Sequence, residues 1–196
     1  WTKEQLLEYI HTPTDERLYA LGEAIRKGAT NEEINKETAI VIPFIQIIRD
    51  AIDYEKVIAE NVKNPDVLLK AKDMGFSDSY IGRVWGMSKT DMFKFRKEHN
   101  ILPIYRIVDN VEHQQDYVPY FYSCYHGENE SIRTDKKKIL VLGSGPIRIG
   151  QGVEFDYSTV HAVWAIKEAG YEAIIINNNP ETVSTDYTTA DKLYFE

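Results

Sequence analysis

The chain has 196 residues, of which 43% are hydrophobic and 28% are charged, a composition that excludes a disordered chain and a membrane protein. No apolar run approaches the length of a membrane span, and we expect no secretory signal. The single cysteine, Cys124, cannot form an intrachain disulfide, and the net charge of −8 argues weakly against nucleic-acid binding. We therefore expect a folded cytoplasmic protein with one ordinary domain or two small ones.

Residues 1–105 predict a series of short helices, because helix start and stop signals recur along them. Thr2 with Gln5, and Thr30 with Glu33, have the spacing of a capping box, in which each side chain bonds the backbone N–H of the other residue. Short helices gain their stability by packing an apolar face, so these segments predict a small all-helical domain.

A second helix is expected to begin after Thr12, with Pro13 at its first helical position, where a proline costs no hydrogen bond. Leu18, Leu21 and Ile25 would then form its buried face. The glycine that follows would end this helix.

The longest predicted helix covers residues 43–62. Its apolar residues follow helical spacing and form a nearly continuous stripe: Phe44, Ile47, Ile48, Ala51, Ile52, Ile58 and Ala59. Such a stripe is wide enough to pack against neighbouring helices and against a second chain. An internal core is the simpler interpretation, and the sequence leaves both open.

Three further helices are expected to begin at Asn64, Ser77 and Ser88. The last two form a helical hairpin over residues 75–100. The second helix of this hairpin is basic and carries Lys89, Lys94, Arg96 and Lys97. The hairpin resembles a DNA-binding helix-turn-helix. Because such shapes are common in all-helical domains, a solvated basic face is the simpler interpretation.

The sequence changes character after residue 105. The run 117–125 is aromatic and contains a proline, which disfavours a helix and indicates an extended segment that attaches to a neighbouring domain. The polar stretch 126–136 then predicts a linker. We expect a helical domain over residues 1–125, this linker, and an α/β domain over residues 137–196.

The last third begins with a buried strand that runs into a glycine-rich turn, and the turn opens a helix. The glycines of this turn are Gly143, Gly145, Gly150 and Gly152. Backbone N–H groups at such a helix start favour anions. The dinucleotide fingerprint is absent, because its third glycine would stand at Arg148 and Asn177 stands where an acid would hold a ribose. No Gly-Lys-Ser/Thr follows for a nucleoside triphosphate, and a tight turn without a ligand is equally consistent.

A second strand over residues 171–176, a polar turn and a third strand near residues 193–195 predict a Rossmann-like βαβ unit with parallel strands. Glu154 and Glu181 each follow the carboxyl end of a strand. Because adjacent parallel strands end at one edge of a sheet, the two carboxylates could share a crevice and guide a polar substrate. Two solvated surface acids are the simpler alternative. The histidines and the cysteine show no ligand spacing, so we expect no metal site.

Three segments of the last third form a specific combination. They are Ile139–Tyr157 with its Glu-Phe-Asp-Tyr, Asn177–Tyr187 with its Asn-Pro-Glu-Thr, and Asp191–Glu196. Together they resemble the opening of the second synthetic half of the large chain of carbamoyl phosphate synthetase. The resemblance implies an internal fragment of that chain, whose last part is a truncated pre-ATP-grasp domain.

The helical part is similar to the oligomerization domain of the same family. The segments that carry this similarity are Pro13–Leu18, Lys70–Gly86 and Ile101–Asp109, with Pro119–Ser123 matching the junction. One segment departs from the family pattern, because Asn110–Gln115 replaces the usual Thr-Cys-Ala-Ala-Glu-Phe. The contacts of this connector are therefore left open.

The family's full enzyme makes carbamoyl phosphate from bicarbonate, two ATP and ammonia, which a separate glutaminase small subunit releases from glutamine. The resemblance implies that ATP and Mg²⁺ (or Mn²⁺) bind to ATP-grasp domains outside this chain. It also implies that the present chain holds no catalytic residue and is inactive alone. By motif match, Glu154 and Glu181 fall at glutamates of the carbamate tunnel, and the helical domain would self-associate. Arginine and pyrimidine synthesis are both possible pathways. The alternative is a non-enzymatic DNA-binding or scaffold module built on the basic hairpin.

Overall fold

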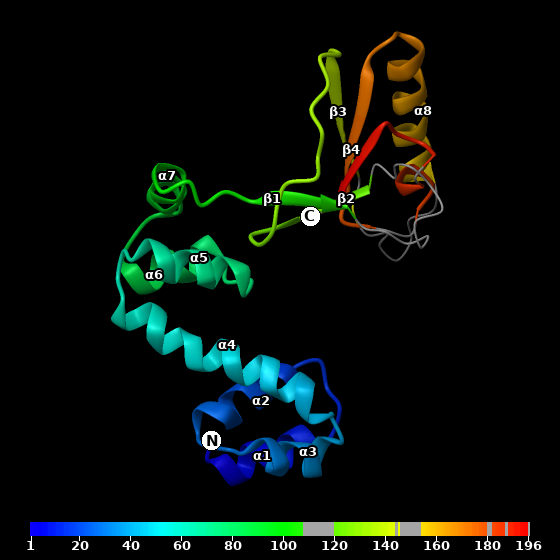
Figure 1. The fold of residues 1–196 in the computed structure, drawn as a ribbon. Coiled ribbons are helices and arrows are strands. Elements are labelled where there is room, and N and C mark those ends of the chain that lie inside the picture. Colours follow the sequence, from blue (N-terminus) through cyan, green and yellow to red (C-terminus); the bar gives the residue numbers. More distant parts are fainter. Residues whose placement is uncertain (108–119, 144, 146–153, 180–181, 187, 196) are drawn as a thin grey trace. The chain divides into compact units, whose positions relative to one another are not determined.

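The computed structural model describes residues 1–107, 120–143, 145, 154–179, 182–186 and 188–195 (Figure 1). The chain divides into two compact units, Trp1–Ile101 and Leu102–Glu196. The first unit, in which every residue is described, has only helices as regular structure. The described part of the second unit contains a five-stranded sheet, a long helix and a 3-10 turn. These elements confirm the predicted α plus α/β fold.

The helices of the first unit are α1 (Lys3–His11), α2 (Arg17–Arg26), α3 (Asn31–Thr38), α4 (Ile42–Glu60), α5 (Pro65–Asp73), α6 (Asp78–Trp85) and α7 (Lys89–Glu98). Both predicted capping boxes are confirmed, at the starts of α1 and α3. The N–H of Thr2 donates to Gln5 Oε1 over 2.9 Å, and the N–H of Gln5 donates to Thr2 Oγ1 over 3.3 Å. Thr30 and Glu33 make the same reciprocal pair. Each box satisfies N–H groups that a first helical turn leaves unpaired.

The predicted start of the second helix was wrong. α2 begins at Arg17, and Pro13 lies in the connection that precedes it. Thr12 is extended, with ψ of 127°, because the residue before a proline avoids the helical region, and α1 ends there. The guanidinium of Arg17 donates to the carbonyl oxygen of Ile10 over 2.6 Å and so holds the end of α1. Leu18, which was predicted to be buried, is 59% exposed.

A core of apolar side chains joins α1, α2, α3 and α4. Its buried members are Leu6, Ile10, Leu21, Ala24, Ile25, Ala29, Ile34, Ile45 and Ile52. Within α4, Ile45 and Ile52 face this core, whereas Phe44 and Ile47 are 63% and 65% exposed. The apolar stripe predicted for the longest helix therefore has a buried side and an exposed side.

α5, α6 and α7 begin at the three predicted side-chain caps, Asn64, Ser77 and Ser88.

Arg96 of the basic helix α7 is only 8% exposed, and its guanidinium lies 2.8 Å from the carboxylate of Asp78 at the start of α6. Arg96 therefore stabilises the packing of the two helices and is not part of a solvated basic face.

The second unit contains β1 (Ile104–Ile107), β2 (Tyr120–Cys124), β3 (Lys138–Leu142), α8 (Glu154–Glu168), β4 (Glu172–Ile176), η1 (Val183–Thr185) and β5 (Lys192–Phe195). The sheet order is β1-β2-β5-β4-β3, and all neighbouring pairs are parallel except β1 with β2. β2 lies in the aromatic run that was predicted to be extended. Its Phe121 is fully buried and stacks on Tyr194 of β5. By this pairing β1 and β2 belong to the sheet of the second unit, so the prediction of a helical domain over residues 1–125 was wrong beyond Ile101.

The two faces of the sheet carry different side chains, because successive residues of a strand point to opposite sides. Val163 of α8 packs with Ala173, Ile175 and Leu193, which are odd-numbered strand residues. In β3, β4 and β5, the even-numbered residues therefore lie on the face away from α8. There Leu140 is 51% exposed.

Gly82 of α6 lies against the turn that leads into α7. A Cβ on Gly82 would lie 2.8 Å from the backbone oxygen of Met87 and 3.0 Å from Cγ of Met92. Gly22 of α2 is a contrasting case, because a Cβ there would lie 3.5 Å from Cδ1 of Ile52, which is an ordinary contact. The two glycines thus occupy helices with different amounts of room.

We expect Gly82→Ala to lower the free energy of unfolding by about 1–3 kcal/mol, because the new methyl group forces the Met87 backbone away from α6. Gly22→Ala is the matched control. It should leave stability unchanged or raise it by up to about 1 kcal/mol, since alanine favours a helix. Urea unfolding of the 196-residue chain measures both variants. Equal stability of the two would contradict the close approach of α6 to the turn.

Candidate functional site

The candidate site lies at the edge of the sheet where β3 and β4 end. The two strands pair in parallel up to Leu142 and Ile176, and the N–H of Gly143 donates to the carbonyl oxygen of Ile176 over 2.8 Å. Both following segments therefore leave the sheet at the same edge. α8 begins soon after β3 and carries Glu154 and Asp156 in its first turn.

The structure describes only some of the residues that were predicted for this edge. Gly143, Gly145 and Glu154 are described, whereas Gly150, Gly152 and Glu181 lie outside the described residues. Gly145 has φ of 75°, a left-handed conformation that glycine adopts without strain. Glu154 is exposed as the first residue of α8. The meeting of Glu154 and Glu181 in one crevice stays a prediction.

Two buried polar side chains connect the segments at this edge. Asn177 directly follows β4 and is 3% exposed, and its Oδ1 accepts the N–H groups of Gly145 and Asn179 over 3.1 and 3.3 Å. Asp156 is 4% exposed, and its Oδ2 accepts the N–H of Ser184 over 2.7 Å. The first bond set joins the turn after β3 to the turn after β4, and the second joins α8 to η1.

No structural role was predicted for Asn177 from the sequence. The available signal was an asparagine at the end of a strand, since asparagine side chains often bond the backbone of nearby turns. The partner in the other turn, Gly145, is 32 residues away in the sequence, and the spacing alone does not indicate that pairing.

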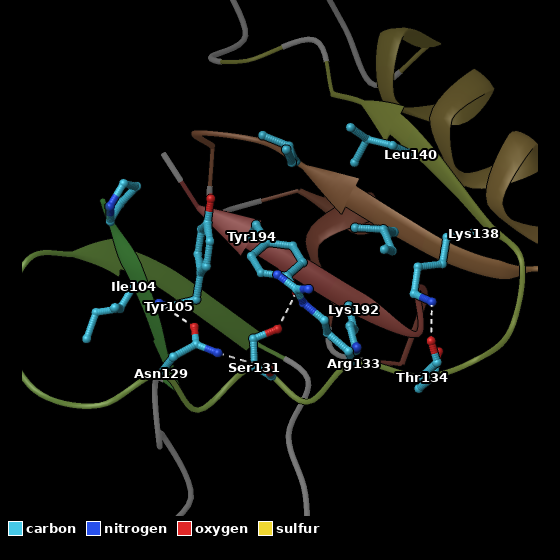
Figure 2. Close-up of a pocket in the computed structure, with 13 residues that line it drawn as sticks. Ile104, Tyr105, Asn129, Ser131, Arg133, Thr134, Lys138, Leu140, Lys192 and Tyr194 are labelled. Atoms are coloured by element: carbon cyan, nitrogen blue, oxygen red, sulfur yellow. Dashed lines mark hydrogen bonds between the residues drawn. The ribbon is translucent and has the colours of Figure 1, made fainter. Parts of the chain in front are cut away.

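A groove of about 690 Å³ lies on the sheet face away from α8. Figure 2 shows Lys138 and Leu140 of β3 and Lys192 and Tyr194 of β5 along this groove. Its floor is apolar, formed by Leu140, Ile174 and Ile176. The hydroxyl groups of Tyr194 and Ser131 bond each other. The groove thus offers an apolar surface, and the hydroxyl groups of Tyr194 and Ser131 beside it are already bonded to each other.

A buried ion pair anchors the beginning of the strands, at the opposite end from the candidate edge. Nζ of Lys192 lies 3.2 Å from Oε1 of Glu172, Nζ of Lys138 lies 3.5 Å from its Oε2, and the Thr134 hydroxyl donates to Oε2. Burial raises the pKa of Glu172. The hydrogen bonds from Thr134 and Lys192, with the two ammonium charges, outweigh this effect and hold the pKa below its usual value.

Three further features bear on the chemistry. Cys124, the single cysteine, is a free, half-buried thiol. Within the described ranges, no three His, Cys, Asp or Glu side chains gather closely enough to hold a metal ion. None of the helices that the structure describes combines the length and apolar character needed to cross a membrane.

Two protein-family models match the chain. The model of the carbamoyl-phosphate synthetase large chain oligomerisation domain matches residues 1–100, and that of the carbamoyl phosphate synthase preATP-grasp domain matches residues 135–196. The first match alone covers more than half of the chain. The chain belongs to the carbamoyl phosphate synthase large-chain family. The resemblance identified in the sequence is thereby confirmed.

The two matches correspond to the two compact units. The oligomerisation-domain match ends at residue 100, and the first unit ends at Ile101. The preATP-grasp match begins shortly before β3, and it includes α8, β4 and β5. β1 and β2 lie between the two matches, but they extend the preATP-grasp sheet through the pairing of β2 with β5.

We expect Glu172→Gln to destabilise the second unit in a pH-dependent way. Because the folded-state pKa of Glu172 is lowered, its contribution to stability is complete above the unfolded-state pKa of about 4.3 and is lost as the pH falls through the folded-state value. The variant should therefore be less protected than the wild type at neutral pH, and the difference should shrink upon acidification. Amide hydrogen exchange of β4, compared at matched pH, measures this difference.

Glu168→Gln is the control, because Glu168 is exposed at the other end of α8. It should leave the exchange of β4 unchanged at each pH. If the difference in β4 exchange between the wild type and Glu172→Gln stays constant from neutral to acidic pH, the role of the buried carboxylate is contradicted.

Proposed function

We propose that this chain is part of the large chain of a glutamine-dependent carbamoyl phosphate synthase, an ATP-dependent ligase. Such an enzyme makes carbamoyl phosphate from bicarbonate, glutamine-derived ammonia and two ATP. The observation that supports the proposal is the pair of family matches over residues 1–100 and 135–196. In this proposal the chain contributes subunit association and part of the wall of the carbamate route, and the chemical steps take place elsewhere in the large chain.

The proposed wall lies at the edge where β3 and β4 end. Glu154 begins α8 at this edge, and Glu181 follows Ile176 by five positions in the sequence. The parallel register of β3 and β4 supports a common crevice, since both connections leave the sheet on one side. Carboxylates there would accept hydrogen bonds from the nitrogen of the intermediate. An enclosed wall would also exclude water, in which carbamate hydrolyses.

The proposal assigns ATP and Mg²⁺ (or Mn²⁺) to ATP-grasp domains of the large chain and the release of ammonia to a glutaminase small subunit. Asp156 at the candidate edge is not available to a metal–nucleotide complex, because it is buried and already accepts the N–H of Ser184. We further propose a cytoplasmic location, with the product used for arginine or pyrimidine synthesis.

We also propose that the first unit associates with a second copy through the beginning of α4. Four large apolar residues are exposed there: Val41, Ile42, Phe44 and Ile47, with exposed fractions of 52%, 42%, 63% and 65%. Clustered exposed apolar side chains mark interaction sites. The match of this unit to an oligomerisation domain supports a copy of the same chain as the partner.

In the complete enzyme, we expect Glu154→Ala to reduce the carbamoyl phosphate formed per ATP hydrolysed on the order of tenfold, equivalent to about 1.4 kcal/mol. Bicarbonate-dependent ATP hydrolysis should change by less than about twofold, because only transfer of the intermediate is impaired. Glu168→Ala, at the far end of α8, should change neither rate. Equal loss of synthesis and ATP hydrolysis would contradict a role of Glu154 in the carbamate route.

For self-association, we expect the double substitution of Phe44 and Ile47 by glutamate to convert the 196-residue chain to monomers. Two carboxylates in an apolar contact lose their hydration without gaining partners. Sedimentation velocity over a concentration series measures the effect. Phe93→Glu is the control, because Phe93 of α7 is also exposed, at 50%, but lies outside this cluster. The surface is wrongly assigned when the double variant and the control have the same sedimentation behaviour.

A further inference from the structure

Asn177 is the residue where three segments of the candidate edge meet. Its backbone N–H donates to the carbonyl oxygen of Tyr194 over 3.1 Å and so connects the end of β4 to β5. On the other side of β4, the N–H of Gly143 donates to the carbonyl oxygen of Ile176 over 2.8 Å. The backbone of Asn177 is therefore held between the two neighbouring strands.

The side chain of Asn177 bonds to the turns that follow β3 and β4. Its Oδ1 accepts the N–H of Gly145, in the turn after β3, and the N–H of Asn179, in the turn after β4. Because one oxygen takes both bonds, the orientation of the amide is determined. Its Nδ2 is buried and has no hydrogen-bond partner among the described residues.

The absence of a side chain at Gly143 makes room for this amide. A Cβ on Gly143 would lie 2.5 Å from Cγ, 2.6 Å from Nδ2 and 2.7 Å from Cβ of Asn177. Such distances are far inside van der Waals contact. A larger residue at position 143 would therefore displace the Asn177 side chain and break its bonds to both turns.

We infer that Asn177 is a positioning residue of the carbamate route, and this inference rests on the function proposed above. In the sequence, Glu154 follows Gly145 by nine positions and Glu181 follows Asn179 by two. By fixing Gly145 and Asn179 to a single oxygen atom, Asn177 sets the starting points of both glutamate-bearing segments. It acts on the route through these backbone bonds and needs no contact with the intermediate.

The test uses the complete enzyme and compares three variants. Asn177→Ala removes the acceptor and should lower the carbamoyl phosphate formed per ATP on the order of tenfold, while bicarbonate-dependent ATP hydrolysis changes by less than about twofold. Asn177→Asp keeps an oxygen at the Oδ1 position and should recover most of the coupling. Asn178→Ala removes an exposed amide one residue further along and should change nothing.

A second measurement reports on the positioning itself. Amide hydrogen exchange at Gly145 and Asn179 should be faster in Asn177→Ala than in the wild type and near the wild-type rate in Asn177→Asp. Gly143→Ala, which keeps the amide but displaces it, should reproduce the Asn177→Ala behaviour in both assays. Gly143→Ala retains Asn177, so it provides the same test if the Asn177→Ala enzyme does not fold.

The possible failures can be told apart. Unchanged exchange at Gly145 and Asn179, or unchanged coupling in Asn177→Ala while Glu154→Ala is uncoupled, would overturn the positioning role alone. Unchanged coupling in Glu154→Ala would instead overturn the proposed carbamate route. Equal loss of synthesis and ATP hydrolysis in Asn177→Ala would show a general structural role, which also contradicts the inference.

Discussion

The parallel register between β3 and β4 determines which side chains of these two strands face α8 and where both strands end. Five residue pairs, from Lys138 with Glu172 to Leu142 with Ile176, fix this register. Because side chains alternate along a strand, it sends Ala173 and Ile175 to α8 and their even-numbered neighbours to the opposite face. A slip of one residue in β4 would place the carboxylate of Glu172 in the apolar layer under α8. The same register brings the ends of both strands to one edge, on which the proposed function depends.

The two ends of these strands use polar groups in different ways. At the beginning, the buried carboxylate of Glu172 is surrounded by Lys192, Lys138 and the Thr134 hydroxyl. Burial of such charges costs hydration energy, and several partners are needed to offset it. At the end, the neutral amide of Asn177 satisfies backbone N–H groups without a buried net charge. The charged end pairs the beginnings of three strands, and at the neutral end lies the exposed carboxylate of Glu154, which the proposed route would use.

The features that depend on neighbours in the sequence were predicted well, and those that depend on distant partners were not. The caps at Asn64, Ser77 and Ser88 involve residues two or three positions away, and the structure has all three. The start of α2 was misplaced, because the helix does not begin at the proline. It begins at Arg17, whose side chain donates to the carbonyl oxygen of Ile10 in α1. In the same way, helical spacing does not indicate that Phe44 lies on the exposed side of α4. Nor does it indicate that β2 pairs with β5, a strand about 70 residues later.

The close contact between Gly143 and Asn177 explains why this edge requires both residues. With any side chain at position 143, the Asn177 amide has no room, because a Cβ would approach its Cγ to 2.5 Å. Without the amide, the N–H groups of Gly145 and Asn179 lose their common acceptor, and nothing then joins the segment after β3 to the segment after β4 through this side chain. The Asn177 amide can accept these N–H groups only while position 143 is glycine, and neither residue carries a charge. The positions of Gly145 and Asn179 are therefore set by a packing constraint across β3 and β4, and in the proposed route the segments that carry the glutamates start from these two residues.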